Sequence, residues 1–348
     1  MINILAEIKE WVKEERKFAL ATVIKTWRSA PRMEGAVMAI SSNQEILGSV
    51  SGGCVEGAVI KEAMEVIQTG VPKRLSFGVT NEDAWTVGLS CGGQIEVLVE
   101  PFEEEIEDRF NILGNKTIWE KLAESIEQNK GCVLVHQLGQ SKKKHLLVYP
   151  DENFYGSVDK YSWITAALLA YKEHKNQIIQ TNEDELFLSV FPAKDRLLII
   201  GAAHISADLV DLAHQFNFET TVIDPRGIFT NKMHFTTPPD AIHEKWPAEV
   251  LPDFPLDADT YAVVLTHDPK IDDQALHILL RSEVSYIGAL GSRKTHAKRK
   301  ARLEEAGFTE TEISRIHGPV GVSINARRPK EIALSILGEL VMMKNRYL

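Results

Sequence analysis

The chain has 348 residues and a formal net charge of −10, with 44% hydrophobic and 25% charged residues. This length favours two or three domains, and the composition is that of a globular protein. The acidic balance argues against non-specific binding to nucleic acid or anionic membranes. No apolar run approaches the ~18 residues of a membrane span, and the N-terminal segment lacks the apolar block of a signal peptide. Three widely spaced cysteines make no disulfide framework, so we expect a cytoplasmic protein with reduced thiols.

The first hundred residues predict an α+β unit. Apolar spacing indicates helices over 4–16 and 57–69, and strands over 18–26, 36–41, 45–50 and 95–101. The loop SGGCVEG, residues 51–57, precedes the second helix, and another glycine-rich loop, GLSCGG, covers 88–93. Glycines permit positive φ and let other groups approach the backbone closely. We therefore interpret these two loops as the ligand site of this domain.

Residues 115–192 resemble a second copy of this unit. Residues 145–173 align without a gap on 37–65, with Ser162 in place of Cys54 and Ile164 in place of Glu56. The second copy has no counterpart of GLSCGG. Either the domain is an internal duplication with subrepeats at about 17–101 and 130–192, or short hairpin–helix units resemble one another by chance. A duplication would place the chemistry in the first copy.

The last part of the chain predicts a doubly wound α/β domain with a parallel sheet. A proline-containing linker precedes LLIIG, a continuous apolar strand typical of buried parallel sheets. Strands alternate with helices from there to the C-terminus. The expected strands cover 197–201, 220–225, 261–267 and 285–291, and the expected helices cover 204–217, begin near 272 and 294, and cover 331–345. We divide the chain into an N-terminal α+β domain, 1–192, and a Rossmann-like domain, 193–348.

The first strand and helix of the second domain have the layout of a dinucleotide fingerprint. Gly201 opens the turn, and Asp224 follows the next strand, where a carboxylate accepts a ribose hydroxyl. Ala203 replaces the glycine that would let the backbone contact a pyrophosphate, so NAD(P) binding is only weakly supported. Arg226 suits a phosphate. Alternatively, Asp224 and Arg226 form a surface ion pair in a strand-ending turn.

Polar residues also follow the later strands, whose carboxyl ends share one edge of the sheet. His267 ends one strand, Ser292 and Arg293 open a helix suited to an anion, and His317 lies in the loop HGPVG. These residues are expected to converge with His204 after the first strand. Loop-capping or surface roles are the alternative for each histidine, because their spacing fits no standard metal motif. Of the basic residues on the helix that Arg293 opens, only Arg293 is expected to face the cleft.

Cys54 and Cys91 are the candidate sulfur ligands. A cysteine between glycines is exposed, and its thiolate is favoured near a helix N-terminus. No histidine or CxxC partner completes a zinc set, so we interpret the pair as a transient, exchangeable site for a soft metal. Each thiol could instead be a small buried loop residue. Cys132 lies within a strand and is assigned to the core.

Four further residues complete the site predicted for the first domain: Arg32, Gly52, Gly53 and Glu56. Arg32 offers a planar donor fork to phosphate or oxo groups, or else forms a surface ion pair. Glu56 could be a base, a wall that repels anions, a partner of Arg32, or simply a carboxylate favoured near a helix start. No catalytic residue is assigned.

In combination, these motifs resemble those of the XdhC/CoxI family. ATVIKTWRSAPR (21–32), GSVSGGCVEGAVI (48–60) and GLSCGG (88–93) resemble its N-terminal part. LLIIGAAHIS, VIDPR, VLTHDPK, IGALGSR, HGPVG and PKEIALSI resemble its C-terminal Rossmann-like part. The resemblance covers nearly the whole chain in order. Ala203 departs from it, since many relatives have glycine there.

The resemblance implies a maturation factor for molybdenum hydroxylases such as xanthine dehydrogenase, and a cofactor-binding chaperone rather than an enzyme. Such a factor binds the molybdenum cofactor (molybdopterin) as cargo, holds it during sulfuration by a cysteine desulfurase, and delivers it to the apoenzyme. Cys54 and Cys91 would then face the molybdenum or an incoming persulfide, while the helix start at Ser292 and Arg293 or the Rossmann-edge amides would hold the phosphate. The expected partners are the hydroxylase, the desulfurase and a second copy in a homodimer, with no nucleic acid and no membrane.

Two other functions stay open. An NAD(P)-dependent oxidoreductase with an appended thiol domain predicts saturable NAD(P)H binding, and Ala203 counts against it. A non-catalytic scaffold between desulfurase and client predicts a defined protein complex without a ligand.

Overall fold

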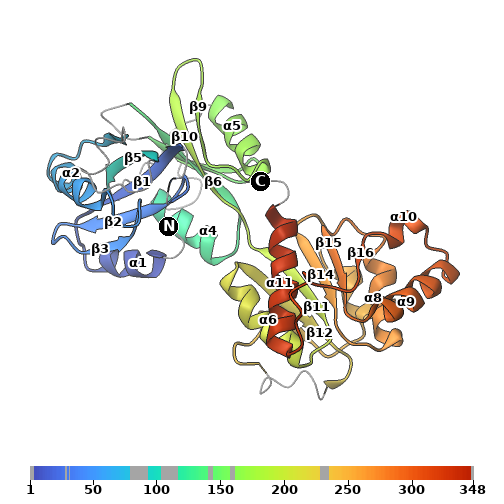
Figure 1. The fold of residues 1–348 in the computed structure, drawn as a ribbon. Coiled ribbons are helices and arrows are strands. Elements are labelled where there is room, and N and C mark those ends of the chain that lie inside the picture. Colours follow the sequence, from blue (N-terminus) through green and yellow to red (C-terminus); the bar gives the residue numbers. More distant parts are fainter. Residues whose placement is uncertain are drawn as a thin grey trace. The chain divides into compact units, whose positions relative to one another are not determined.

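The structure is a computed structural model that describes residues 4–27, 30, 32–78, 93–102, 117–139, 144–156, 161–227 and 235–345. The chain divides into two compact units, residues 1–193 and 194–348, each with a fold of its own (Figure 1). Within those described ranges, no helix combines the length and the apolar character needed to cross a membrane.

The first unit contains two five-stranded antiparallel sheets with the same strand order. The first sheet has the order β3-β2-β1-β5-β4, formed by β1 (Phe18–Trp27), β2 (Val37–Ser41), β3 (Ile46–Gly48), β4 (Lys73–Phe77) and β5 (Gln94–Pro101), with α1 (Leu5–Lys13) and α2 (Glu56–Thr69). The second has the order β8-β7-β6-β10-β9, formed by β6 (Cys132–Gln137), β7 (His145–Val148), β8 (Phe154–Gly156), β9 (Gln177–Gln180) and β10 (Glu185–Phe191), with α4 (Ile118–Glu127) and α5 (Tyr161–Lys172). An internal duplication predicts this identical order of elements.

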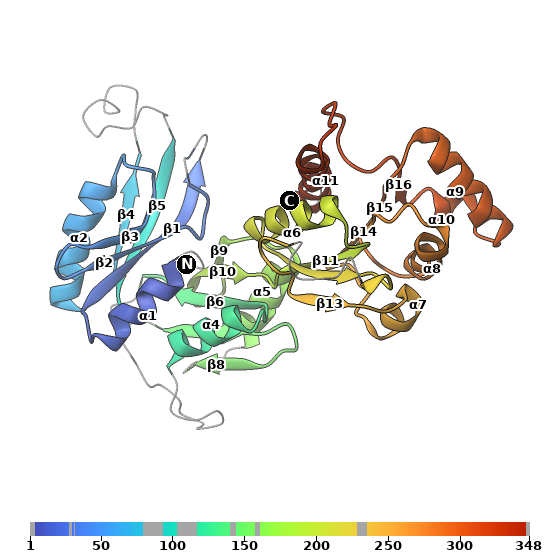
Figure 2. The ribbon, with the colours of Figure 1, turned by 90° about the horizontal axis from the view of Figure 1, so that it is seen from below.

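Side chains of β1 alternate between the two faces of the first sheet, and each face packs against a different part of the unit. Ala19 and Ala21 face α2, which lies along one side of the first sheet (Figure 2). Leu20, on the opposite side, packs with α1. Further along that same side, Ile24 joins a cluster with Phe187 of the second sheet. The two sheets of this unit therefore share an interior, because strand side chains alternate between the two faces.

The second unit contains a six-stranded parallel sheet with the order β13-β12-β11-β14-β15-β16. Its strands are β11 (Asp195–Ile200), β12 (Phe218–Ile223), β13 (Ala241–His243), β14 (Thr260–Val264), β15 (Tyr286–Ala289) and β16 (Ile316–His317). Its helices are α6 (His204–Gln215), α7 (Pro247–Val250), η4 (Leu251–Asp253), α8 (Pro269–Leu279), α9 (Arg293–Glu305), α10 (Glu310–Ile313) and α11 (Pro329–Lys344). Numbered along the unit, this order is 3-2-1-4-5-6, that of the Rossmann fold, so the predicted fold class is confirmed.

Helices cover both faces of the parallel sheet (Figure 1). Leu197 and Ile199 of β11 pack against α6 and α11, whereas Leu198 and Ile200 pack against α8 and α9. A strand buried on both faces needs an uninterrupted apolar run, which explains why β11 is readily found from sequence. The edge strand β4 was not predicted, because it alternates half-buried with exposed residues and carries Lys73 and Arg74.

Candidate functional site

The loop before α2 is a series of bends that two glycines make possible. Gly52 and Gly53 have φ values of 78° and 117°, in a region that other residues rarely adopt. A Cβ added to either glycine would meet no atom of the described residues within 4 Å. With respect to the part of the chain that the structure describes, the space beside this loop is open, as expected for a place where another molecule contacts the backbone.

Glu56, the first residue of α2, holds this loop in shape. Its carboxylate accepts backbone N–H groups from Ser51 at 2.8 Å, Gly52 at 3.0 Å and Gly53 at 2.9 Å. The hydroxyls of Ser49 and Ser51 also donate to it. Burial alone would raise the pKa of Glu56, but these hydrogen bonds outweigh it and lower the pKa to about 2. The geometry favours a loop-organising carboxylate over a base or a partner of Arg32.

The described part of the second copy differs from this loop at the start of its helix. Helix α5 begins at Tyr161, the position aligned with Gly53, so it starts three residues earlier than α2. Ile164, aligned with Glu56, is buried in the core of the second sheet. Where the second copy is described, from Tyr161 onward, the positions aligned with Gly53 to Val55 are helical, whereas in the first copy they form the loop that carries Cys54.

Cys54 is partly exposed in this loop, and its backbone N–H donates to Ser51 Oγ at 3.0 Å. Cys132 is fully buried in β6, and burial raises the pKa of its thiol to about 12. Among the described cysteines, only Cys54 is within reach of solvent. Arg32 is exposed in the turn before β2. Cys91 lies outside the described residues, so its pairing with Cys54 stays a prediction.

In the second unit, the glycine turn after β11 is tightly packed. Gly201 has φ 111°, and a Cβ there would lie 2.8 Å from Thr266 Cγ2 of the loop after β14. Asp224, fully buried, accepts the Ala202 N–H at 2.8 Å and three N–H groups of Arg226 at 2.8–2.9 Å. A carboxylate has about four acceptor positions, so these bonds leave none for a ribose hydroxyl. Asp224 and Arg226 thus form an ion pair, as in the alternative, but the Asp224 carboxylate is buried and not at the surface.

The other predicted residues do follow strands at the carboxyl edge, but two have structural roles. Ser292 caps α9 by accepting the Thr295 N–H at 3.1 Å, and His317 Nδ1 lies 2.8 Å from Glu339 Oε1. His204, His267 and Arg293 are exposed. Among the described residues, none of these histidines belongs to a group of three metal-ligand atoms.

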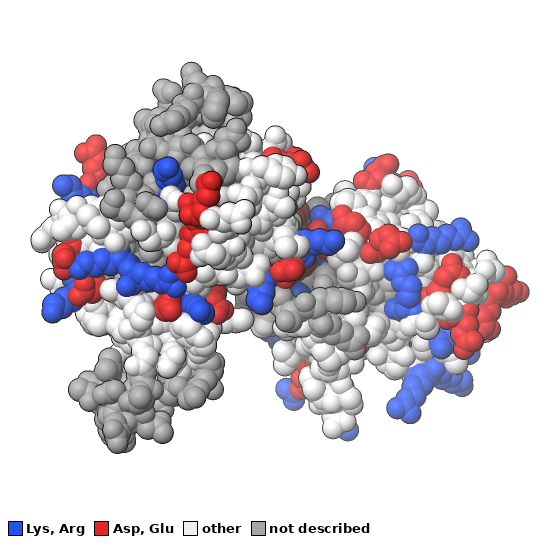
Figure 3. Space-filling view, turned by 90° about the horizontal axis from the view of Figure 1, so that it is seen from above, with Lys and Arg blue, Asp and Glu red and all other residues white. Residues whose placement is uncertain are grey.

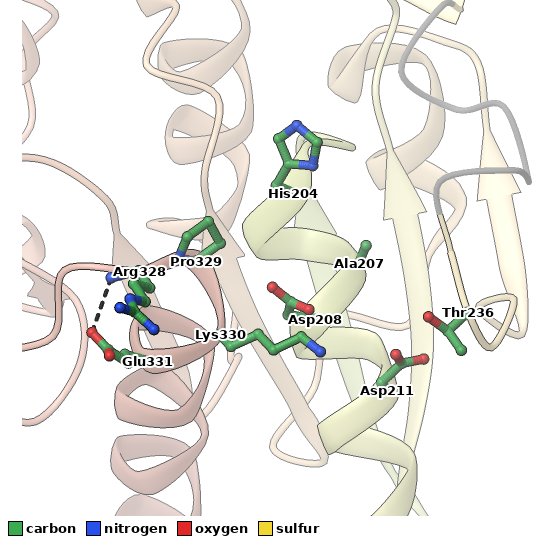
Figure 4. Close-up of a pocket in the computed structure, with 9 residues that line it drawn as sticks. All are labelled: His204, Ala207, Asp208, Asp211, Thr236, Arg328, Pro329, Lys330 and Glu331. Atoms are coloured by element: carbon green, nitrogen blue, oxygen red, sulfur yellow. Dashed lines mark hydrogen bonds between the residues drawn. The ribbon is translucent and has the colours of Figure 1, made fainter.

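A hollow of about 480 Å³ lies between α6 and the start of α11 (Figure 4). Its lining is charged with both signs, from His204, Asp208 and Asp211 on one side and Arg328, Lys330 and Glu331 on the other. Lys330 extends across it toward the aspartates (Figure 4). Such a mixed lining gives no preference for an anionic ligand, so this hollow adds nothing to the predicted phosphate site.

On the basic helix α9, Arg299 differs from the exposed residues beside it, Lys298 and Lys300, because it points into the interior. This side chain is buried, donates to the Leu290 carbonyl at 2.8 Å, and lies 3.6 Å from the Asp272 carboxylate. Leu303, one turn later, shares the inward face and is the signal that could have identified it. Elsewhere, acidic and basic side chains are interspersed on both units, on the face that Figure 3 shows.

The two units are thus a thiol-bearing α+β unit with repeated topology and a Rossmann-like unit, and comparison with known proteins agrees. A family model described as the XdhC Rossmann domain matches residues 197–340, and one described as the XdhC and CoxI family matches residues 11–78. The chain belongs to the XdhC/CoxI family, as its motifs predicted.

Similar proteins extend over the whole chain. A Bacillus subtilis protein named as a probable component of xanthine dehydrogenase is 26% identical, over 96% of each chain. The molybdenum cofactor insertion chaperone PaoD of Escherichia coli is 24% identical, over 93% of this chain and 83% of that protein. A crystal structure of a xanthine dehydrogenase from Bacillus halodurans is 27% identical with a TM-score of 0.76, covering 98% of this chain and 96% of that one.

Proposed function

We propose that this chain is a maturation factor that binds the molybdenum cofactor, holds it while sulfur is inserted, and delivers it to a molybdenum hydroxylase such as xanthine dehydrogenase. Membership of the XdhC/CoxI family and likeness to a molybdenum cofactor insertion chaperone support this role. The observation that carries it is Cys54, a partly exposed thiol in a glycine loop, at a position where the aligned residue of the second copy, Ser162, lies within helix α5.

The thiol of this loop suits the metal of the cofactor, whereas the loop amides do not suit its phosphate. Molybdenum is thiophilic, so Cys54 Sγ would contact the metal or its terminal sulfur. The N–H groups of Ser51, Gly52 and Gly53 already donate to Glu56, so they do not bind the cofactor phosphate. The phosphate therefore needs donors elsewhere, such as the exposed Arg32 or the start of α9.

The proposal includes two protein partners but no NAD(P). A cysteine desulfurase as sulfur donor and a homodimer follow from the family resemblance and are tested by co-purification and light scattering. NAD(P) is not included, because Ala203 occupies the second glycine position and the Asp224 carboxylate is fully engaged.

Cofactor content tests the proposal. The chain is expressed in a molybdopterin-producing host and purified without oxygen, and pterin fluorescence is measured after denaturation and oxidation. Stoichiometric pterin that Cys54→Ala loses and Cys132→Ala retains supports the proposal, since Cys132 is a buried thiol of the same unit. NAD(P)H binding without pterin would favour the oxidoreductase, and neither ligand would favour the scaffold.

A further inference from the structure

Three titratable side chains meet in the interior of the first unit, away from the thiol loop. Glu100 comes from β5 of the first sheet, and His136 and His145 come from β6 and β7 of the second. The two histidines are directly opposite one another in the antiparallel pair β6–β7. Strand pairing and the packing of the two sheets thus bring the three residues together.

The ligand atoms lie close to the spacing that a metal ion requires. Glu100 Oε2 lies 3.0 Å from His136 Nδ1, and Glu100 Oε1 lies 3.1 Å from His145 Nε2. Each residue offers one such atom within 4.8 Å of the others. A tetrahedral zinc ion with bonds of ~2.0–2.2 Å separates its ligand atoms by roughly 3.3–3.5 Å. Small side-chain adjustments would therefore accommodate an ion.

Glu100 and His136 are shielded from solvent, whereas His145 is slightly exposed to it. The side chains of Glu100 and His136 are 5% and 3% exposed, and that of His145 is 11% exposed. The His145 ring contacts Trp119 edge-on, with centroids 5.6 Å apart, and the His136 ring lies 5.7 Å from Phe187. An ion would enter past His145, where a water could complete its coordination.

The scaffold itself does not require ionisable residues here. The matching strand registers of the two sheets place Thr22, Val37 and Ser189 at the positions equivalent to His136, His145 and Glu100. At each of the three positions, the other sheet of this unit therefore carries an uncharged side chain. Burying a carboxylate and two imidazoles costs free energy that uncharged side chains avoid, so their chemistry is the better explanation for their presence.

We propose that Glu100, His136 and His145 bind a divalent transition-metal ion of the zinc class, with water as the fourth ligand. Two imidazoles and one carboxylate suit such an ion, whereas magnesium and calcium prefer oxygen ligands alone. The ion would replace the protons that now join Glu100 to the histidines and would cross-link the two sheets. This proposal does not depend on the proposed function.

Metal titration of the full chain tests this site. The protein is stripped with a chelator, and zinc and cobalt binding are followed by elemental analysis, cobalt absorption and the melting temperature. We expect one equivalent of zinc that raises the melting temperature of the wild type. Glu100→Gln and His145→Gln should weaken zinc binding by about tenfold or more.

Controls separate this site from the thiols and from misfolding. Cys54→Ala should keep the zinc equivalent, and His174→Gln, in the turn after α5, should keep it too. Circular dichroism of the stripped variants establishes that each is folded. No zinc binding by the wild type, or equal binding by folded Glu100→Gln and His145→Gln, would overturn the proposal.

Discussion

Ser51 and Glu56 are joined twice, since the Ser51 N–H donates to Glu56 Oε1 at 2.8 Å and the Ser51 hydroxyl donates to Oε2. Five residues apart, the two close the loop before α2, whereas α5 of the second copy is already helical from Tyr161, the position aligned with Gly53. These bonds hold Cys54 in the loop before the helix and direct the loop N–H groups toward the Glu56 carboxylate. The shape of the thiol loop therefore depends on the Glu56 carboxylate.

Replacing Glu56 should release the loop. Glu56→Ala leaves the N–H groups of Ser51, Gly52 and Gly53 without their acceptor, so we expect a loss of about 1–3 kcal/mol in the free energy of unfolding. Urea denaturation measures it. Lys61→Ala, an exposed change on the same helix, is the matched control. Equal stability of the two variants would show that the carboxylate does not organise the loop.

The same carboxylate should make stability depend on acid pH. The pKa of Glu56 falls from 4.5 in its ordinary state to about 2 in the fold, so its contribution is fully present above about pH 4.5 and is lost as pH falls toward 2. Allowing for solvent screening of this half-buried group, the contribution is about 1–2 kcal/mol. Denaturation of wild type and Glu56→Gln at several pH values should give a difference that shrinks below pH 4.5. A constant difference would contradict the assignment.

Cys54 should react with alkylating agents in the folded protein, whereas Cys132 should not. Cys54 is partly exposed, and Cys132 is fully buried with a thiol pKa raised to about 12. Mass spectrometry of peptides after timed alkylation distinguishes the two sites, and denaturant should make Cys132 reactive. Labelling of Cys132 at the rate of Cys54 in the native state would be incompatible with this structure.

Asp224 should matter for stability. Asp224→Ala removes the acceptor of the Ala202 N–H and the partner of Arg226, and we expect a loss of about 2–4 kcal/mol. Asp253→Ala, at an exposed position of the same unit, serves as the control. If the melting temperature changes equally in both variants, Asp224 has no structural role and its carboxylate is available to a ligand.

Two glycines should respond in opposite directions to alanine. Gly201→Ala puts a Cβ 2.8 Å from Thr266 Cγ2 at a residue with φ 111°, so we expect a loss of about 2 kcal/mol or more. Gly57→Ala, inside α2, adds a Cβ that meets no described residue within 4 Å, and we expect a gain of about 0.4–1 kcal/mol. Chemical denaturation compares them, and a stabilising Gly201→Ala would contradict the tight turn.

The sequence by itself determined the alternation of strands and helices, the Rossmann-like domain and the family. Those features are local: an apolar run such as β11 or a glycine loop such as residues 51–57 depends on neighbouring residues alone. Periodicity also identified Cys132 as a core residue, because its strand is apolar.

Tertiary structure alone decided where the charged side chains point. Glu56 turned back onto its own loop, Arg299 turned inward, and Asp224 filled its acceptors with Arg226. Glu100 met His136 and His145, which are 36 and 45 residues away in the chain. A charged side chain has no periodic signal of its own, and contacts across such separations form only when sheets pair and pack. The chemistry of these groups therefore follows from the fold and not from local sequence.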